Sequence, residues 1–269
     1  MAVVRPARRV RRLVHRARHA AVRTIAGGVV TITGTGSRAT RALGVLTLAL
    51  FALLALLGLV LSPPDAAMGE AVRLFYVHVP AALASYAGIA VLGFGSVMYL
   101  WKRSLTWDLL AAAAAEIALV FTALTLVTGS LWGRPTWGTY WEWDPRLTAT
   151  AVLFLLLLGH VAVRAAGGDV HGRARRSAVV GLLATVDVPI VRYSVDWWRS
   201  LHQPATLSKL DPTIDGLMLF SAFVGIVAFM AAFTWFLLHR FRVAWLEEQV
   251  EELSLADAIV ERRAEGGRS

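Results

Sequence analysis

Two histidines and a tryptophan-rich run carry the most distinctive chemistry in this chain of 269 residues. The run spans residues 132–146 and places five large aromatic side chains in a dozen positions: Trp132, Trp137, Tyr140, Trp141 and Trp143. Indole rings offer flat π-faces and N–H donors, which suit a flat, apolar ligand, and Arg134 and Arg146 could pair with carboxylates on it. His78 and His202 lie on either side of the run in the sequence. Two neutral imidazoles could bind an iron ion from opposite sides.

Each of these residues also has an ordinary interpretation. Trp and Tyr anchor membrane proteins at the interface, and a lone histidine there is commonly a hydrogen-bonding surface residue. Anchoring explains one or two aromatics but not five. The interleaved Gly133, Pro135, Gly138 and Pro145 predict a shaped loop instead of a helix end. We interpret the other histidines as structural or solvated: His15, His19, His160, His171 and His239.

The elements that position these residues are membrane spans. Hydrophobic residues make up 57% of the chain and charged residues 17%, whereas a soluble domain has about 25% charged residues. A hydrocarbon core of roughly 30 Å needs about 20 helical residues. Six apolar runs are candidates: 44–61, 79–100, 109–131, 147–163, 177–191 and 216–238. The fifth is the weakest because it is short and contains Asp187 and Pro189. We predict an all-α polytopic membrane protein with six transmembrane helices.

Basic residues set the orientation, because Lys and Arg are retained on the cytoplasmic side. Most of the 27 basic residues lie in four segments on one side of the predicted membrane, including both ends of the chain. The other side holds only Arg73, Arg134, Arg146, Arg192, Arg199 and Lys209. Both termini are therefore predicted to be cytoplasmic, with the Trp-rich loop on the outer face between helices 3 and 4. The chain divides into a basic N-terminal arm (1–42), a six-span domain (43–238) and a cytoplasmic amphipathic tail (239–269).

The charged segments have lipid-based interpretations. Apolar residues at helical spacing within 10–21 predict an amphipathic helix on the inner leaflet, and the net charge of +9 favours anionic lipid. Nucleic-acid binding by the arm is a weaker alternative, and a transit peptide is another. Within the spans, Glu116 is interpreted as half of an ion pair or as a protonated carboxyl. Asp187 is a charge at membrane depth with no assigned role.

The absence of cysteine excludes disulfides, thiolate metal sites and a covalent thioether link to haem. The chain also has no GxxxxGK[ST] phosphate loop, so any dependence on ATP would come from a partner. We expect this chain to be a binding protein with no bond-making active site, and not an enzyme.

Three segments together resemble the haem exporter protein C family, CcmC, of cytochrome c maturation. They are the Trp-rich run, residues 77–82 (VHVPAA) and residues 189–204 (PIVRYSVDWWRSLHQP). The resemblance covers roughly residues 43–238. The related CcmF and CcsA share the Trp-rich loop but are larger, with more spans and more histidines. Six spans and two outer histidines favour CcmC.

The resemblance implies a function and a set of site residues. Members bind haem at the outer face of the cytoplasmic membrane and load it onto the haem chaperone CcmE, working with CcmD and the ABC transporter CcmAB. His78 and His202 match the family's axial histidines. The residues that match its haem-interacting loop are Trp132, Trp137, Trp141, Trp143, Asp144 and Arg146. Tyr140 stands where relatives can have Trp, and the basic arm departs from the usual pattern.

Other functions compete with haem delivery. A membrane b-type cytochrome would keep its haem permanently, but such proteins generally place paired histidines inside the bilayer, where only His160 is predicted here. A CcsA-like haem exporter or synthetase component is a second alternative. A transporter that moves its substrate between the helices is a third, although the spans contain few polar residues apart from Asp187.

Overall fold

The computed structural model describes residues 24–25, 28–29, 36–202, 214 and 216–266. The chain forms two units, Met1–Ser37 and Arg38–Ser269. In the first unit, strands β1 (Thr24–Ile25) and β2 (Gly28–Val29) pair antiparallel, with Thr24 opposite Val29. The amphipathic helix predicted within residues 10–21 lies outside the described residues.

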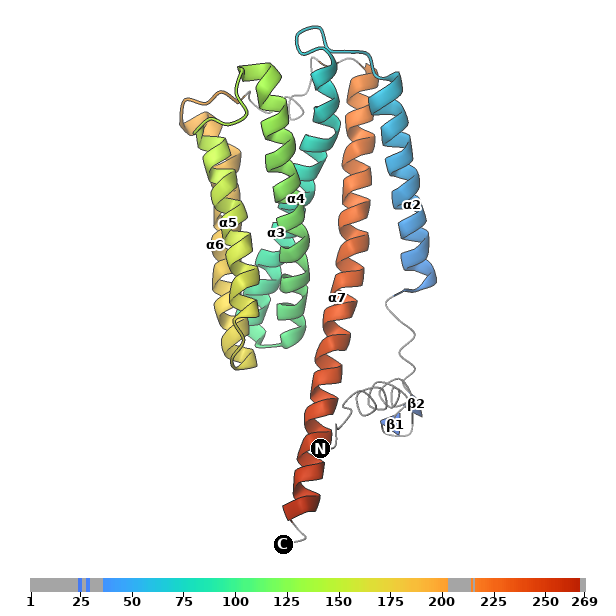
Figure 1. Ribbon diagram of the computed structural model, residues 1–269, viewed down its shortest axis with the longest axis vertical. Coiled ribbons are helices and arrows are strands. Elements are labelled where there is room, and N and C mark those ends of the chain that lie inside the picture. Colours follow the sequence, from blue (N-terminus) through green and yellow to red (C-terminus); the bar gives the residue numbers. More distant parts are fainter. Residues whose placement is uncertain (1–23, 26–27, 30–35, 203–213, 215, 267–269) are drawn as a thin grey trace, which may run out of the picture. The chain divides into compact units, whose positions relative to one another are not determined.

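The second unit is helical in its described part. Its elements are α2 (Arg38–Ala55), the π-helical turn η1 (Leu56–Leu61), the 3-10 helix η2 (Glu70–Leu74), α3 (Phe75–Lys102), α4 (Leu105–Trp137), α5 (Pro145–Ala165), α6 (Val170–Trp197) and α7 (Gly216–Gly266) (Figure 1). Six helical segments among the described residues are long and apolar enough to cross a membrane. The prediction of six spans is confirmed, and the weak fifth candidate is a helix of 28 residues.

Helices α3 and α4 form the centre of this unit. Helices α5 and α6 pack on one side of them and α7 on the other, and α2 packs against α7 (Figure 1). The central pair approaches closely because its contact residues are small: a Cβ added at Gly88 would lie 2.9 Å from the Cβ of Ala118. Small residues allow membrane helices to approach in this way. The resulting close contact fixes the two helices that carry most of the candidate site.

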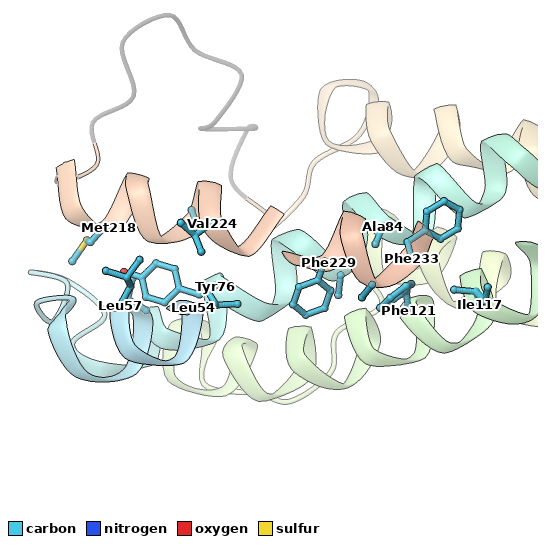
Figure 2. Packing of buried hydrophobic residues seen from close by; sticks show 14 residues of the cluster. Leu54, Leu57, Tyr76, Ala84, Ile117, Phe121, Met218, Val224, Phe229 and Phe233 are labelled. Carbon is cyan, nitrogen blue, oxygen red and sulfur yellow. The ribbon is translucent and has the colours of Figure 1, made fainter. Parts of the chain in front are cut away.

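Aromatic side chains fill the space between the central helices and α7. Phe229 of α7 lies with its ring centroid 5.1 Å from that of Phe51 and 5.8 Å from that of Phe121. Figure 2 shows Phe229 on the side of α7 that meets Phe121 of α4, whereas the ring of Phe233 lies against α3, where a Cβ added at Gly88 would be 3.3 Å from its Cε2. Buried apolar contacts of this kind hold α7 against α3 and α4. Helix α7 therefore lies close enough to α3 and α4 to contribute residues to a cavity lining.

Ion pairs join α4 to α5 and α7 towards the N-terminal end of α4. Glu116 of α4 accepts two hydrogen bonds from Arg240 of α7, at 2.5 Å and 2.9 Å, which confirms its interpretation as half of an ion pair. Asp108 of α4 pairs with Arg164 of α5 at 2.5 Å. Asp187 is buried, and its Oδ2 has no hydrogen-bond partner within the part of the chain that the structure describes.

Two boundaries differ from the predictions. The first half of the Trp-rich run is helical, because α4 continues to Trp137 and only residues 138–144 form a loop. The helix ends at Gly138, whose φ of 81° is favourable for glycine and whose N–H donates to the Arg134 carbonyl at 3.0 Å. At the other end of the chain, α7 continues without a break to Gly266, so the tail is not a separate short helix.

Candidate functional site

A cavity of about 700 Å³ lies beside the loop at residues 138–144, among α3, α4, α5, α6 and α7. This volume falls within the range of roughly 300–1,000 Å³ that small-molecule and cofactor sites occupy. The predicted site residues that line it are His78, Trp132, Trp137, Trp141, Arg146 and His202. Folding thus brings together residues from three separate parts of the sequence.

His78 lies in the first turn of α3 and faces α4. Its Nδ1 donates to the Thr125 carbonyl at 3.1 Å and lies 3.1 Å from the Thr128 hydroxyl oxygen. The ring also packs against Gly129, where an added Cβ would lie 2.9 Å from His78 Cε1. Because Nδ1 carries the hydrogen, Nε2 carries the lone pair that a metal requires.

His202 follows α6 and is held by a carboxylate. Its Nδ1 lies 3.2 Å from Asp144 Oδ1, and its ring meets the edge of Trp137 at a centroid distance of 4.7 Å. Donation from Nδ1–H to a carboxylate fixes the tautomer and leaves Nε2 as the ligating atom, as in most metal-binding histidines. Both histidines of the cavity are therefore oriented through Nδ1.

Asp144 organises the loop around His202 without lining the cavity. It is only 6% exposed and begins α5, where its Oδ1 accepts from the backbone N–H of Arg146 at 2.9 Å. Its Oδ2 accepts from the Ser200 hydroxyl at 2.6 Å and from the Leu201 N–H at 2.7 Å. One carboxylate thus joins the start of α5 to the segment that follows α6.

The electrostatics of this pair favour a carboxylate beside a neutral imidazole. Burial raises the pKa of the Asp144 carboxyl, but the hydrogen bonds from Ser200, Leu201 and Arg146 outweigh burial, and the pKa lies below its ordinary value. Burial, together with the nearby positive charge of Arg146, outweighs the neighbouring Asp144 carboxylate and lowers the pKa of His202 below its ordinary value. At neutral pH His202 is therefore neutral, the state in which imidazole binds metals.

Two guanidinium groups line the cavity. Arg146 was predicted, but Arg192 was not, and Arg146 Nη2 donates to the Arg192 backbone carbonyl at 3.2 Å. The sequence could have pointed to Arg192, because it is one of the few basic residues predicted on the outer side. Arg134 does not line the cavity. Its guanidinium donates to the Gly138 carbonyl and lies 5.6 Å from the Tyr140 ring centroid, so its expected role with carboxylates on the ligand is not supported.

Tyr140 and Trp143 lie outside the cavity lining. Their exposed fractions are 58% and 79%, and Trp143 meets Trp141 edge to face at 5.7 Å. Trp197 and Trp198 are exposed as well and contact one another. These four aromatics fit the ordinary interpretation as anchors at the membrane interface. The Trp-rich run therefore contributes some aromatic side chains to the cavity lining and others to the protein surface.

The part of the cavity between α3, α4 and α7 is mostly apolar, and it was not predicted from the sequence. Its polar groups are hydroxyls, from Ser85, Thr122 and Thr125. One wall comes from α7 through Leu219, Ala222, Phe223 and Ile226. Their spacing places them on one face of a helix, but an apolar face in a membrane span gives no sign of whether it meets lipid, protein or a ligand.

The arrangement suits a flat ligand that brings its own metal. No group of three or more His, Cys, Asp or Glu side chains that could hold a metal ion occurs among the described residues. Two imidazoles that line one cavity are, by contrast, a sufficient donor set for iron in a planar macrocycle. The buried Trp132 Nε1–H has no hydrogen-bond partner in the described part of the chain, so it offers a donor at the cavity wall.

Comparisons with known proteins agree with one another. The family model described as "CcmC: Heme exporter protein C" matches residues 26–256. A protein named "Heme exporter protein C" from Bradyrhizobium diazoefficiens is 40% identical over 200 residues, covering 74% of this chain and 76% of that protein. Its namesake from Haemophilus influenzae is 37% identical over 210 residues, with coverage of 77% and 84%. The one from Escherichia coli K12 is 41% identical over 174 residues, with coverage of 60% and 70%.

Proposed function

The chain belongs to the haem exporter protein C family, and on that basis we propose that it binds haem transiently between His78 and His202 and passes it on for cytochrome c maturation. The observation that carries the proposal is the pair of histidines in one cavity, each held through Nδ1. The protein is a multi-pass membrane protein. We place the site at the outer face of the cytoplasmic membrane, with both termini in the cytoplasm.

The cavity residues have separate roles in holding haem. The iron of bound haem would accept the two imidazoles as axial ligands. Trp132, Trp137 and Trp141 would cover the macrocycle with aromatic faces and edges. Arg146 would pair with the propionates, since guanidinium and carboxylate groups match in a bidentate fashion. None of these contacts is covalent, so the haem can leave intact.

The recipient of the haem is proposed to be the chaperone CcmE, with CcmD and the ABC transporter CcmAB as further partners and membrane lipid around the spans. No nucleic acid is required. Delivery involves no bond-making by this chain, which is therefore not an enzyme in this proposal. Energy from ATP would enter through CcmAB, because this chain lacks a phosphate-binding loop.

Purification in detergent tests the proposal. We expect the protein to show a Soret band and to transfer its haem to purified CcmE in a mixing experiment followed by absorption of the separated proteins. A protein that never acquires a Soret band contradicts haem binding. Tight, stoichiometric haem with reversible redox chemistry and no transfer would instead indicate a b-type cytochrome.

Substitution of Gly129 by alanine is expected to weaken haem binding, because the added Cβ would lie 2.9 Å from His78 Cε1 and would push the imidazole off its ligating position. We expect roughly a tenfold loss, at the lower end of what outer-shell changes cost at metal sites. Haem titration followed by the Soret band measures it. Gly159→Ala is the matched control, since nothing lies within 4 Å of a Cβ there. Equal affinities of the two variants would show that the Gly129 contact does not position His78.

A further inference from the structure

From His78 the cavity extends along α3 towards the C-terminal end of that helix and reaches its lipid-facing surface. Three residues of α3 that line it, Val79, Leu83 and Tyr86, continue along the helix as a stripe of exposed residues at 90, 94, 97 and 101. The spacing of three and four residues keeps all of them on one face. Tyr86 lies about 12 Å along the helix axis from His78, at 1.5 Å per residue. This part of the cavity is therefore within the membrane-spanning portion of α3.

The opposite edge of this opening is formed by α7. Phe223 lines the cavity and is nevertheless 64% exposed, so the cavity reaches the surface beside it. Helices α6 and α7 both pack on α3, and they share no extended contact with each other within the described residues (Figure 1). The lining here is apolar: Val79 and Leu83 of α3 face a wall built from Phe223 and Ile226 of α7.

We propose that this gap over α3 is a lateral portal, through which haem dissolved in the outer half of the bilayer enters the cavity. The inference rests on the proposed function and adds the route to it. An apolar macrocycle that moves from lipid into an apolar lining never exposes that surface to water, which would be costly. The charged groups, Arg146 and Arg192, line the same cavity and suit the propionates, while Val79, Leu83 and Phe223 admit the ring.

A single bulky label at the portal tests the route, and the natural chain offers a background without cysteine. Leu83→Cys is labelled in detergent with a bulky maleimide and then reconstituted in phospholipid vesicles that contain haem in the bilayer. The matched control is Phe94→Cys with the same label, because Phe94 is exposed on the same face of α3 but does not line the cavity. Haem loading is followed by the growth of the Soret band.

We expect labelled Leu83→Cys to load at least tenfold more slowly than labelled Phe94→Cys. Labelled Phe223→Cys, on the other side of the portal, should behave in the same way. Loading of both portal variants at the control rate, or a loss of final amplitude without slowing, would overturn the portal. Unlabelled wild-type protein that never acquires a Soret band would instead contradict the proposed function.

Discussion

Replacement of His78 or His202 by alanine is expected to weaken haem binding by more than about 100-fold, the upper end of the loss that an outer-shell partner causes at metal sites. Each imidazole would supply one of the two axial bonds to iron. Among the described residues that line the cavity, His78 and His202 are the only histidines. Haem titration and the position of the Soret band measure the effect.

Two controls separate ligand loss from misfolding. Free imidazole should restore the wild-type spectrum in His78→Ala and His202→Ala, because it can enter the space left by the side chain. His239→Ala removes an imidazole from α7 outside the cavity lining and should bind haem like the wild type. Unchanged haem affinity and spectrum in both site variants would refute the ligand assignment.

Asp144→Asn is expected to weaken haem binding by about 10–100-fold, the range for partners that orient a metal-binding histidine. The carboxylate accepts from His202 Nδ1, Ser200 and Leu201. An amide in its place turns one acceptor oxygen into a donor, so one of these groups would face a second donor. The expected result is a displaced His202 and a spectrum that resembles that of His202→Ala.

Asp169→Asn provides the matched control for Asp144→Asn. Asp169 begins α6 as Asp144 begins α5, and it accepts from the Gly172 N–H at 2.6 Å, but it does not line the cavity. Asparagine caps a helix about as well as aspartate, so this variant should keep wild-type haem affinity. If free imidazole fails to restore the spectrum of Asp144→Asn, the residue does not act through His202, and if both variants lose haem equally, helix capping explains the loss.

The membrane topology was accessible from sequence because it depends on length and composition. An uncharged run such as 216–238 has no other stable environment than a bilayer or a large core. The same reasoning failed at Trp137, because proline and glycine are ordinarily signs of a loop. Pro135 lies in the last turn of α4, and Gly138 directly follows the end of that helix. Both positions are compatible with a helix that continues to Trp137.

The candidate site was accessible only in part. His78 and His202 stand out as residue types, and the Trp-rich run is dense enough to draw attention. The sequence could not show that Asp144 acts through His202, because that contact joins residues 58 positions apart. Nor could it separate Trp141, which lines the cavity, from the exposed Trp143, since both belong to one short loop whose path depends on its neighbours.

The two histidines are anchored with unequal strength. His78 is part of a helix that is packed along its length against α4, and its ring is enclosed by Gly129 and the Thr125 carbonyl. His202 follows the end of α6 in a segment without helical structure, where the Asp144 carboxylate, the Ser200 hydroxyl and the edge of Trp137 hold it. In the proposed haem site, we therefore expect the iron to be released from His202 before it is released from His78.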